Sequence, residues 1–378
     1  MHVGIFTNTP AHVHLYREAI KSLRSRGHRT SVFARDDECT LALLSYHGIP
    51  HHVYGSRDIS KLGLVNELPR QARTIAGLVR ELDPDLMIGM GVYSTYAATI
   101  ASVDAITVMD SEPTATKQRL SAPLVEAILT PSTFRRYLGR KHYAFYGFKE
   151  TAYLHPEVFE SDSSIRETLG VAAGESYSLV RFNAFNGHHD VGQRGFTPAQ
   201  KRELVQMLAD HGTVFVSDEA GRISFDEPGV RRYEAHPARM HDAIAGADLL
   251  IADTQTMVTE SALIGTPTIR SNSFVGDRDM GNFVALERAG LVRNRSDFEN
   301  VLADVETLLA DPETGERWRR RRDAFLADKC NLTAVLVDLV EDIATGESVA
   351  AAVDRHPSLH RRHRHDARTV HARVPGDA

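Results

Sequence analysis

The sequence predicts an α/β protein built from two doubly wound domains, each a parallel sheet covered by helices. Short apolar runs rich in β-branched residues alternate with segments of helical period, which is typical of parallel strands joined by crossover helices. This alternation occurs twice, before and after an irregular aromatic segment at residues 140–165, where we expect the domain crossing. The chain has 378 residues, a length that suits two domains and a tail.

The first domain is expected within residues 1–150. Its first strand, Val3–Thr7, is followed by a helix at Ala11–Arg26, with Thr9 placed to cap this helix and Pro10 in its first position. Further strands are expected at Thr30–Ala34, His52–Tyr54, Leu86–Gly89, Ile106–Met109 and Ala127–Leu129. Further helices are expected at Thr40–Tyr46, Leu64–Leu82 and Tyr93–Ser102.

The second domain is expected within residues 151–330. Its predicted strands are Tyr177–Phe182, Thr213–Val216, Leu249–Ala252 and Thr268–Ile269. Its predicted helices are Pro198–Asp210, Arg239–Ala245, Met257–Ile264, Asp297–Ala310 and Gly315–Asp328. Residues 331–348 form a C-terminal segment that contains an amphipathic helix, expected at Asn331–Ala344. Residues 349–378 carry too few apolar side chains to bury a core, so we expect a disordered tail rich in His and Arg.

The charge distribution argues against nucleic acid as a partner. The formal charge is -6, and the six Arg and three Asp from Val353 onward contribute +3, so residues 1–352 carry -9. Phosphate neutralisation needs a clustered basic surface, which this acidic body does not provide. No apolar run approaches the roughly 20 residues that span a bilayer. The first residues look like a core strand and not a signal peptide, so we expect a cytoplasmic protein.

The most informative stretch is ADLLIADTQTMVTESALIGTPTI at residues 247–269. An apolar strand ends at Asp253, and a polar turn then opens a helix. The turn consists of Thr254, Gln255 and Thr256. Such a junction directs unpaired backbone N–H groups and the positive end of the helix dipole at a ligand, which suits a diphosphate. Glu260, one to two turns along, can accept hydrogen bonds from sugar hydroxyls. The alternative is that Asp253 or Thr254 is only an N-cap and Glu260 a solvated helix residue.

This stretch resembles the nucleotide-sugar motif of GT-B folds. The non-hydrolysing UDP-N-acetylglucosamine 2-epimerases carry the motif as DSGGxxEExxxLGxP, and the transferase that adds N-acetylglucosamine to the peptidoglycan lipid precursor has a related form. On this resemblance Asp253 matches the Asp of the motif, Thr254 its Ser, and Glu260 the Glu that contacts the uridine ribose. Gln255 and Thr256 replace the two glycines, which leaves less room for a diphosphate at the turn.

The whole chain also resembles a mainly archaeal family of about 350 residues, the length of two such domains, within the GT-B superfamily. This resemblance implies the GT-B fold, with two Rossmann-like domains facing a cleft and the C-terminal helix returning to the first domain, and it implies no particular activity. The segments that carry it are TNTPAHVHLY (7–16), MDSEP (109–113), RFNAFNGHHDVG (181–192) and DTQTMVTESALIGTPTIRSNSFVGDRDMGNF (253–283).

Two segments that define the epimerase reaction differ in this chain. Where the epimerases have HVEAGLR, with a catalytic Glu, this chain has VMDSEPT, with Asp110 in the corresponding place. Where they have HRREN, this chain has RFNAFNGHH. The first hypothesis is therefore a glycosyltransferase that uses a UDP-sugar. The alternatives are an enzyme similar to the UDP-N-acetylglucosamine 2-epimerases and a non-catalytic nucleotide-sugar-binding protein.

Polar residues at the ends of two strands are the candidates in the first domain. Asn8 and Thr9 follow the first strand and are candidates for substrate binding, while His12 or His14 is a candidate general base because imidazole titrates near neutral pH. The alternative is that both histidines lie on the surface.

Asp110 and Glu112 follow a buried central strand, where carboxylates cost desolvation energy unless they are used or paired. We therefore name both as catalytic candidates.

In the second domain, Arg181, Asn183 and His188 follow the first strand and are candidates for hydrogen bonds to a sugar or a phosphate, with Arg181 supplying a planar fork. A metal at residues 188–190 and a solvated loop are the alternatives. Ser273 opens a polar loop that is expected to close over the ligand or to be a plain surface loop.

No metal or cofactor is expected, because GT-B enzymes usually stabilise the leaving diphosphate with a helix N-terminus. The expected partners are a UDP-sugar, which is a substrate, and an acceptor. The arginine run at Trp318–Arg322 is interpreted as a solvated helix face, with peripheral contact to an anionic membrane as the alternative.

Overall fold

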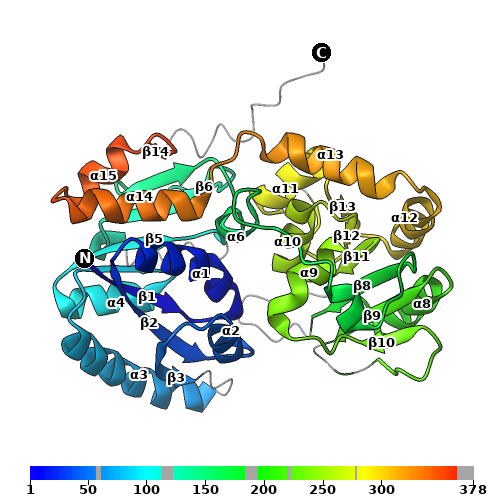
Figure 1. The fold of residues 1–378 in the computed structure, drawn as a ribbon, viewed down its shortest axis with the longest axis horizontal. Helices are drawn as coiled ribbons and strands as arrows, with labels where there is room; N and C mark the ends of the chain where they lie inside the picture. The colour runs from blue at the N-terminus through cyan, green and yellow to red at the C-terminus, as the bar shows by residue number, and fades with distance from the viewer. Residues whose placement is uncertain are drawn as a thin grey trace. The chain divides into compact units, whose positions relative to one another are not determined.

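The structure is a computed structural model, and it forms two compact units (Figure 1). Unit 1 comprises Met1–Val158 and the segment that starts at Lys329, and unit 2 is Phe159–Asp328. The residues that the structure describes are 1–56, 61–112, 122–183, 195–218, 221, 223–276 and 279–363, with the backbone alone for 61–68.

The described part of unit 1 is organised by an eight-stranded sheet in the order β14-β7-β6-β5-β4-β1-β2-β3. All neighbouring strands run parallel except β14 and β7. The chain builds outward from β1 in one direction to β3 and then in the other direction from β4, so the switch point lies between β1 and β4. The strands are β1 (His2–Thr7), β2 (Arg29–Asp36), β3 (His51–Ser56), β4 (Leu86–Gly89), β5 (Asp104–Val108), β6 (Ala127–Pro131), β7 (His142–Phe145) and β14 (Leu359–Arg361).

The helices of unit 1 follow the apolar periodicity of the sequence. In the first of them Val13, Ile20 and Leu23 are buried against the sheet, and Pro10 occupies the first turn as predicted. Thr9 is the N-cap residue, but its side chain makes no capping hydrogen bond. The helices are α1 (Pro10–Ser25), α2 (Thr40–Tyr46), α3 (Lys61–Leu82), α4 (Val92–Ala101), α6 (Thr151–Leu154), α14 (Leu332–Ala344) and α15 (Val349–Arg355), with a 3-10 turn η2 (Ala122–Leu124).

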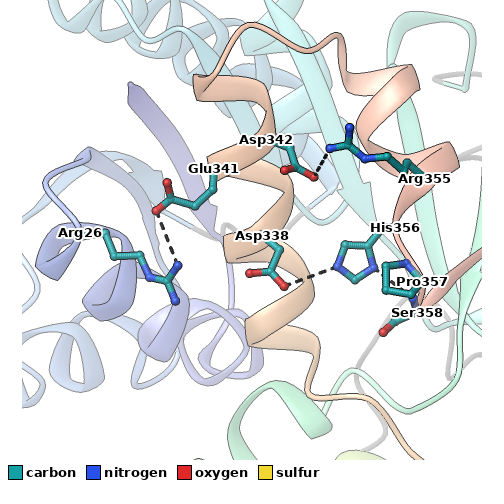
Figure 2. A pocket seen from close by; sticks show the side chains of 8 residues that line it. All are labelled: Arg26, Asp338, Glu341, Asp342, Arg355, His356, Pro357 and Ser358. Carbon is teal, nitrogen blue, oxygen red and sulfur yellow. Dashed lines mark hydrogen bonds and ion pairs between the residues drawn. The ribbon is translucent and has the colours of Figure 1, made fainter.

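The C-terminal helix returns to the first unit, which confirms that prediction. Helix α14 packs against α1 and α6. Its outer face carries carboxylates that pair with basic groups on both sides, as Figure 2 shows. Glu341 lies 3.7 Å from the Arg26 guanidinium, Asp342 lies 3.2 Å from Arg355, and Asp338 lies 3.7 Å from the imidazole of His356. These pairs line a charged surface groove of unit 1.

The prediction of a disordered tail from residue 349 is wrong as far as residue 363. Helix α15 buries Val349, Ala352 and Val353, whose i, i+3, i+4 spacing is that of an apolar helix face. Strand β14 then pairs antiparallel with β7. Arg362 is 5% exposed, and its guanidinium donates to the carbonyl oxygen of Phe134 at 2.8 Å. The segment is ordered because a few apolar side chains and one buried arginine fasten it to unit 1.

Unit 2 repeats the doubly wound pattern with the order β10-β9-β8-β11-β12-β13 in its described part, and all neighbouring strands are parallel. Its switch point lies between β8 and β11. The strands are β8 (Tyr177–Phe182), β9 (Thr213–Asp218), β10 (Val230–Arg232), β11 (Leu249–Ala252), β12 (Thr268–Arg270) and β13 (Arg293–Asn294). The helices are α7 (Ile165–Leu169), α8 (Pro198–Ala209), η3 (Pro237–Arg239), α9 (Met240–Ala245), α10 (Thr256–Ile264), α11 (Gly281–Arg288), α12 (Phe298–Ala310) and α13 (Thr314–Leu326).

The arginine run on α13 is not simply a solvated face. Trp318 is buried, and its indole N–H donates to the carbonyl oxygen of Leu291 at 2.9 Å. Arg322 Nη1 donates to the carbonyl oxygen of Ile264, the last residue of α10, at 3.0 Å. Trp318 and Arg322 therefore satisfy carbonyl groups at or next to the ends of other helices, which sequence periodicity does not reveal. Among the described residues, no helix combines the length and the apolar character that crossing a membrane requires.

Candidate functional site

Three of the predicted residues of unit 2 meet where β8 and β11 end, at the switch point. The backbone N–H of Asn183 donates to Asp253 Oδ1 at 2.6 Å, and the backbone N–H of Asp253 donates to the carbonyl oxygen of Arg181 at 3.3 Å. Arg181 Nη1 donates to the hydroxyl of Ser217 on β9. These contacts exist because β8 lies between β9 and β11 in a parallel sheet, so the carboxyl ends of all three strands share one edge.

Asp253 is the most buried of these groups, with 1% of its surface exposed. Burial raises the pKa of Asp253 to about 7, although the hydrogen bond from Asn183 N–H acts in the opposite direction. The second carboxyl oxygen, Oδ2, is also buried and has no hydrogen-bond partner in the described part of the chain. Near neutral pH this carboxyl group can therefore hold a proton and donate, or accept, one further hydrogen bond.

The turn after Asp253 leaves the start of α10 uncapped. Gln255 is the N-cap residue of α10, not Asp253 or Thr254, and its side chain makes no capping hydrogen bond. The hydroxyl of Thr254 is buried without a hydrogen-bond partner among the described residues. Asn272 Nδ2 donates to the carbonyl oxygen of Asp253 at 3.0 Å and holds the turn in place. A helix start that its own N-cap side chain leaves uncapped is the kind of place where an anionic ligand binds.

Glu260 lies on α10 and is buried, so the alternative of a solvated helix residue is wrong. Its side chain is 8% exposed, and Oε1 lies 3.1 Å from Nε2 of His241 on α9. The pair joins the two helices that flank β11 and leaves the orientation of the carboxylate fixed.

Lys201 was not singled out from the sequence but is part of the same edge. Its Nζ lies 3.1 Å from Asp218 Oδ1 at the end of β9, and 4.5 Å from the centre of the Phe182 ring. The positive charge of Lys201 also lowers the pKa of Asp253. A lysine on the buried face of α8, in register with Leu204 and Leu208, is the sequence signal that would have identified it.

A buried arginine supports the loop beyond this edge. Arg270, at the end of β12, is fully buried and donates to both carboxyl oxygens of Asp279, at 2.6 and 3.2 Å. The guanidinium also donates to Asn294 Oδ1 at 3.2 Å and stacks 3.6 Å from the centre of the Phe283 ring. Ser273, in the same loop, is exposed.

In unit 1, Asn8 is held at the switch point between β1 and β4. Its Oδ1 accepts from the hydroxyl of Tyr54 at 2.8 Å, and its Nδ2 donates to the carbonyl oxygen of Met90 at 3.3 Å. Its backbone N–H donates to Nδ1 of His12 at 3.2 Å. Burial lowers the pKa of His12 to about 3, so this imidazole is neutral at physiological pH.

Asp110 does not stand alone at the end of β5, because Lys149 pairs with it. Lys149 Nζ donates to Asp110 Oδ2 and lies 2.9 Å from Glu150 Oε1. Burial lowers the pKa of Lys149, but the two carboxylates outweigh this effect and raise it. Burial raises the pKa of Glu150, against the opposing charge of Lys149. The Lys-Glu pair lies between apolar residues in the aromatic segment, which is the signal that the sequence offered for it.

His14 and Glu112 have other contacts within unit 1. His14 packs against α6, where its Nδ1 lies 3.3 Å from Arg17 Nη1 and its ring 5.5 Å from that of Tyr153. Glu112 accepts from the backbone N–H of Arg135 at 3.1 Å. His188 lies outside the described residues. Within the described ranges, no group of three or more His, Cys, Asp or Glu side chains is arranged to hold a metal ion.

No protein-family model matches the chain, and no curated protein matches it. Several solved structures are similar to the chain. A putative UDP-N-acetylglucosamine 2-epimerase from Listeria monocytogenes matches with a TM-score of 0.64 at 13% identity, covering 92% of this chain and 97% of that one. The UDP-GlcNAc 2-epimerase from Neisseria meningitidis bound to UDP-GlcNAc matches with a TM-score of 0.61 at 12% identity, covering 92% and 100%. The glycotransferase of kitacinnamycin matches with a TM-score of 0.57 at 15% identity, covering 90% and 98%. These likenesses, with the two parallel sheets, establish that the chain has the GT-B fold.

Proposed function

We propose that the protein is a glycosyltransferase that binds a UDP-sugar at the carboxyl edge of the unit 2 sheet. The observation that carries the proposal is the junction of β11 and α10. There a buried carboxyl group, Asp253, precedes a helix whose first turn has no side-chain cap. A diphosphate is the kind of ligand that satisfies such N–H groups and benefits from the helix dipole.

The residues around this junction supply the other contacts that a nucleotide-sugar needs. Arg181, whose guanidinium donates to Ser217 at the same sheet edge, offers a positive charge, and Glu260 offers a carboxylate oxygen to the hydroxyls of a ribose. At neutral pH the proton that burial retains on Asp253 reduces its repulsion of a diphosphate. The helix N-terminus stabilises the leaving diphosphate, so the proposed transfer needs neither a metal ion nor a cofactor.

On the side of unit 1, the proposal assigns the acceptor to Asn8, His12 and Asp110, which follow β1 and β5. His14 and Glu112 contribute to packing and to a backbone contact in the described structure, so they take no part in the proposed chemistry. The solved neighbours include an epimerase bound to UDP-GlcNAc, which supports a UDP-sugar as the first ligand to try.

The test is binding followed by turnover. Calorimetry and thermal shift with UDP, GDP, CMP and their sugars should give a UDP-dependent signal. Glu260→Gln should weaken that binding about tenfold or more, because a charge-assisted contact to the ribose is lost. Glu306→Gln, at an exposed residue of α12, is the matched control and should bind as the wild type does. If no nucleotide binds, or if Glu260→Gln binds unchanged, the proposal fails.

The turnover assay separates the three hypotheses. A glycosyltransferase consumes the UDP-sugar when an acceptor is present. An enzyme of the epimerase type interconverts the UDP-sugar alone, and a non-catalytic binding protein leaves it intact. The epimerase hypothesis remains the alternative because Asp253 and Glu260 match that motif.

A further inference from the structure

We propose that the nucleotide-sugar site of unit 2 binds its ligand together with a proton, which the carboxyl group of Asp253 holds. A rise in pH therefore weakens binding, so that pH regulates this site. The inference rests on the proposed function, because it needs a ligand that brings the charge of a diphosphate to the start of α10. It adds the exchange of a proton with the solvent to the binding step, and no bond within the ligand changes.

The hydrogen bonds of Asp253 decide which of its oxygens can carry a proton. Oδ1 accepts from the backbone N–H of Asn183 at 2.6 Å, so in the protonated group Oδ1 is the carbonyl oxygen and the proton is on Oδ2. Oδ2 is buried and has no hydrogen-bond partner among the residues that the structure describes. Ionisation would place negative charge on this oxygen without a donor, in a residue that is 1% exposed, and such burial of a charge is costly.

The cations near Asp253 are bonded to other groups and do not offset this cost. The charged side chains of β8, β9, β12, α10 and the buried face of α8 form the contacts Arg181 with Ser217, Lys201 with Asp218, Arg270 with Asp279, and Glu260 with His241. Lys201 and the backbone N–H groups of Asn183 and Phe196 favour the ionised form of Asp253. Burial outweighs them and raises the pKa of Asp253 to about 7.

An anionic ligand shifts this balance further toward the protonated form. Helix α10 begins at Thr256, three residues after Asp253, so a diphosphate at the helix start adds negative charge near the carboxyl group. A nearby like charge disfavours ionisation. In the free protein the carboxyl group of Asp253 is about half ionised at neutral pH, whereas in the complex it is protonated. Binding at or above neutral pH therefore takes up a proton from the solvent.

The test is calorimetry of UDP-GlcNAc binding to the full chain in two buffers that differ in ionisation enthalpy. The difference between the two heats gives the number of protons exchanged. A UDP-sugar lacks the second phosphate proton that titrates near pH 6, so the phosphates of the ligand exchange none. We expect uptake of about one proton per ligand at pH 8 and almost none at pH 5.5, with an affinity that falls about tenfold between pH 6 and pH 8.

Two variants assign the proton. Asp253→Asn keeps an oxygen that can accept from Asn183 N–H but cannot titrate, so its binding should exchange no proton and keep one affinity from pH 6 to pH 8. Asp248→Asn is the matched control, because Asp248 precedes β11 where Asp253 follows it, and Asp248 Oδ2 accepts from the backbone N–H of Tyr177 at 2.9 Å. The control should take up the same proton as the wild type.

Two results would overturn the proposal. One is equal binding heats of the wild type in both buffers at pH 8, a measurement that needs no variant to fold. The other is proton uptake that persists in Asp253→Asn, which would assign the proton to another group such as His241. Failure of the proposed function is seen separately. Binding without proton uptake removes this inference alone, whereas no binding at any pH removes the proposed function and this inference with it.

Discussion

Both units have a doubly wound sheet with a switch point at its carboxyl edge, but the side chains at the two edges differ. In unit 1 the carboxylates Asp110 and Glu150 share a buried lysine, and the histidine nearby is neutral. In unit 2 the carboxyl group of Asp253 accepts from the backbone N–H of Asn183, and the N-cap side chain of the adjacent helix makes no capping hydrogen bond. One edge thus carries a network of buried charges, whereas the other has a buried carboxyl group beside a helix start that its N-cap side chain does not cap. The difference agrees with the proposal that unit 2 holds an anionic nucleotide-sugar.

Breaking the network in unit 1 should have the largest effect. Lys149→Met leaves two carboxylates side by side without their cation, and removal of one partner of a buried ion pair costs about 3–5 kcal/mol of unfolding free energy. Urea unfolding measures this loss of unfolding free energy. Lys141→Met is the control, because it removes a pair in which Lys141 and Glu126 are 37% and 36% exposed, and such pairs contribute about 0–1 kcal/mol. Equal losses in the two variants would show that the buried ion pairs of Lys149 contribute no more to stability than the exposed pair of Lys141.

Replacing the carboxyl group of Asp253 in unit 2 should stabilise the protein, which is the opposite of the effect expected for Lys149→Met. The pKa of Asp253 is raised from 3.8 to about 7, so between these values the folded state keeps a proton that the unfolded state has lost. Stability therefore falls as pH rises through this window, by up to about 4 kcal/mol, and the full penalty is present above pH 7. Asp253→Asn removes the penalty while its amide oxygen can still accept from Asn183 N–H.

We expect Asp253→Asn to be about 2 kcal/mol more stable than the wild type at pH 8, with the advantage fading toward pH 4, as measured by urea unfolding at both values. Asp218→Asn is the matched control in the same sheet edge. Asp218 is paired with Lys201, so its replacement should destabilise the protein at pH 8. A destabilised Asp253→Asn at pH 8 would show that this carboxylate has a partner after all.

Much of this architecture could be predicted from the sequence because parallel strands align their carboxyl ends. Asn8, Asp110, Asn183 and Asp253 each follow an apolar run, and that position alone brings them to the two edges. The pairing of Asp110 with Lys149 could not be predicted, because β7 lies in a segment whose aromatic residues hide its strand period.

The ordered end of the chain was missed for a related reason. Its polar composition dominates, whereas its order depends on three apolar positions of α15 and on buried hydrogen bonds of Arg362. Composition averages over a segment, and order here is set by particular residues.

The smallest predicted effect concerns the hydroxyl groups of two buried tyrosines in unit 1, Tyr54 and Tyr16. Tyr54 donates to Asn8 Oδ1 at 2.8 Å, whereas the hydroxyl of Tyr16 is buried with no hydrogen-bond partner in the described part of the chain. Tyr54→Phe should cost about 1 kcal/mol, because it leaves a buried amide oxygen without its donor. Tyr16→Phe should cost nothing or stabilise the protein slightly, since it removes a buried polar group that gains no bond on folding. Both are measured by urea unfolding at one pH. Equal losses would mean that the Tyr16 hydroxyl has a hydrogen-bond partner in solution, and would contradict the distinction between the two tyrosines.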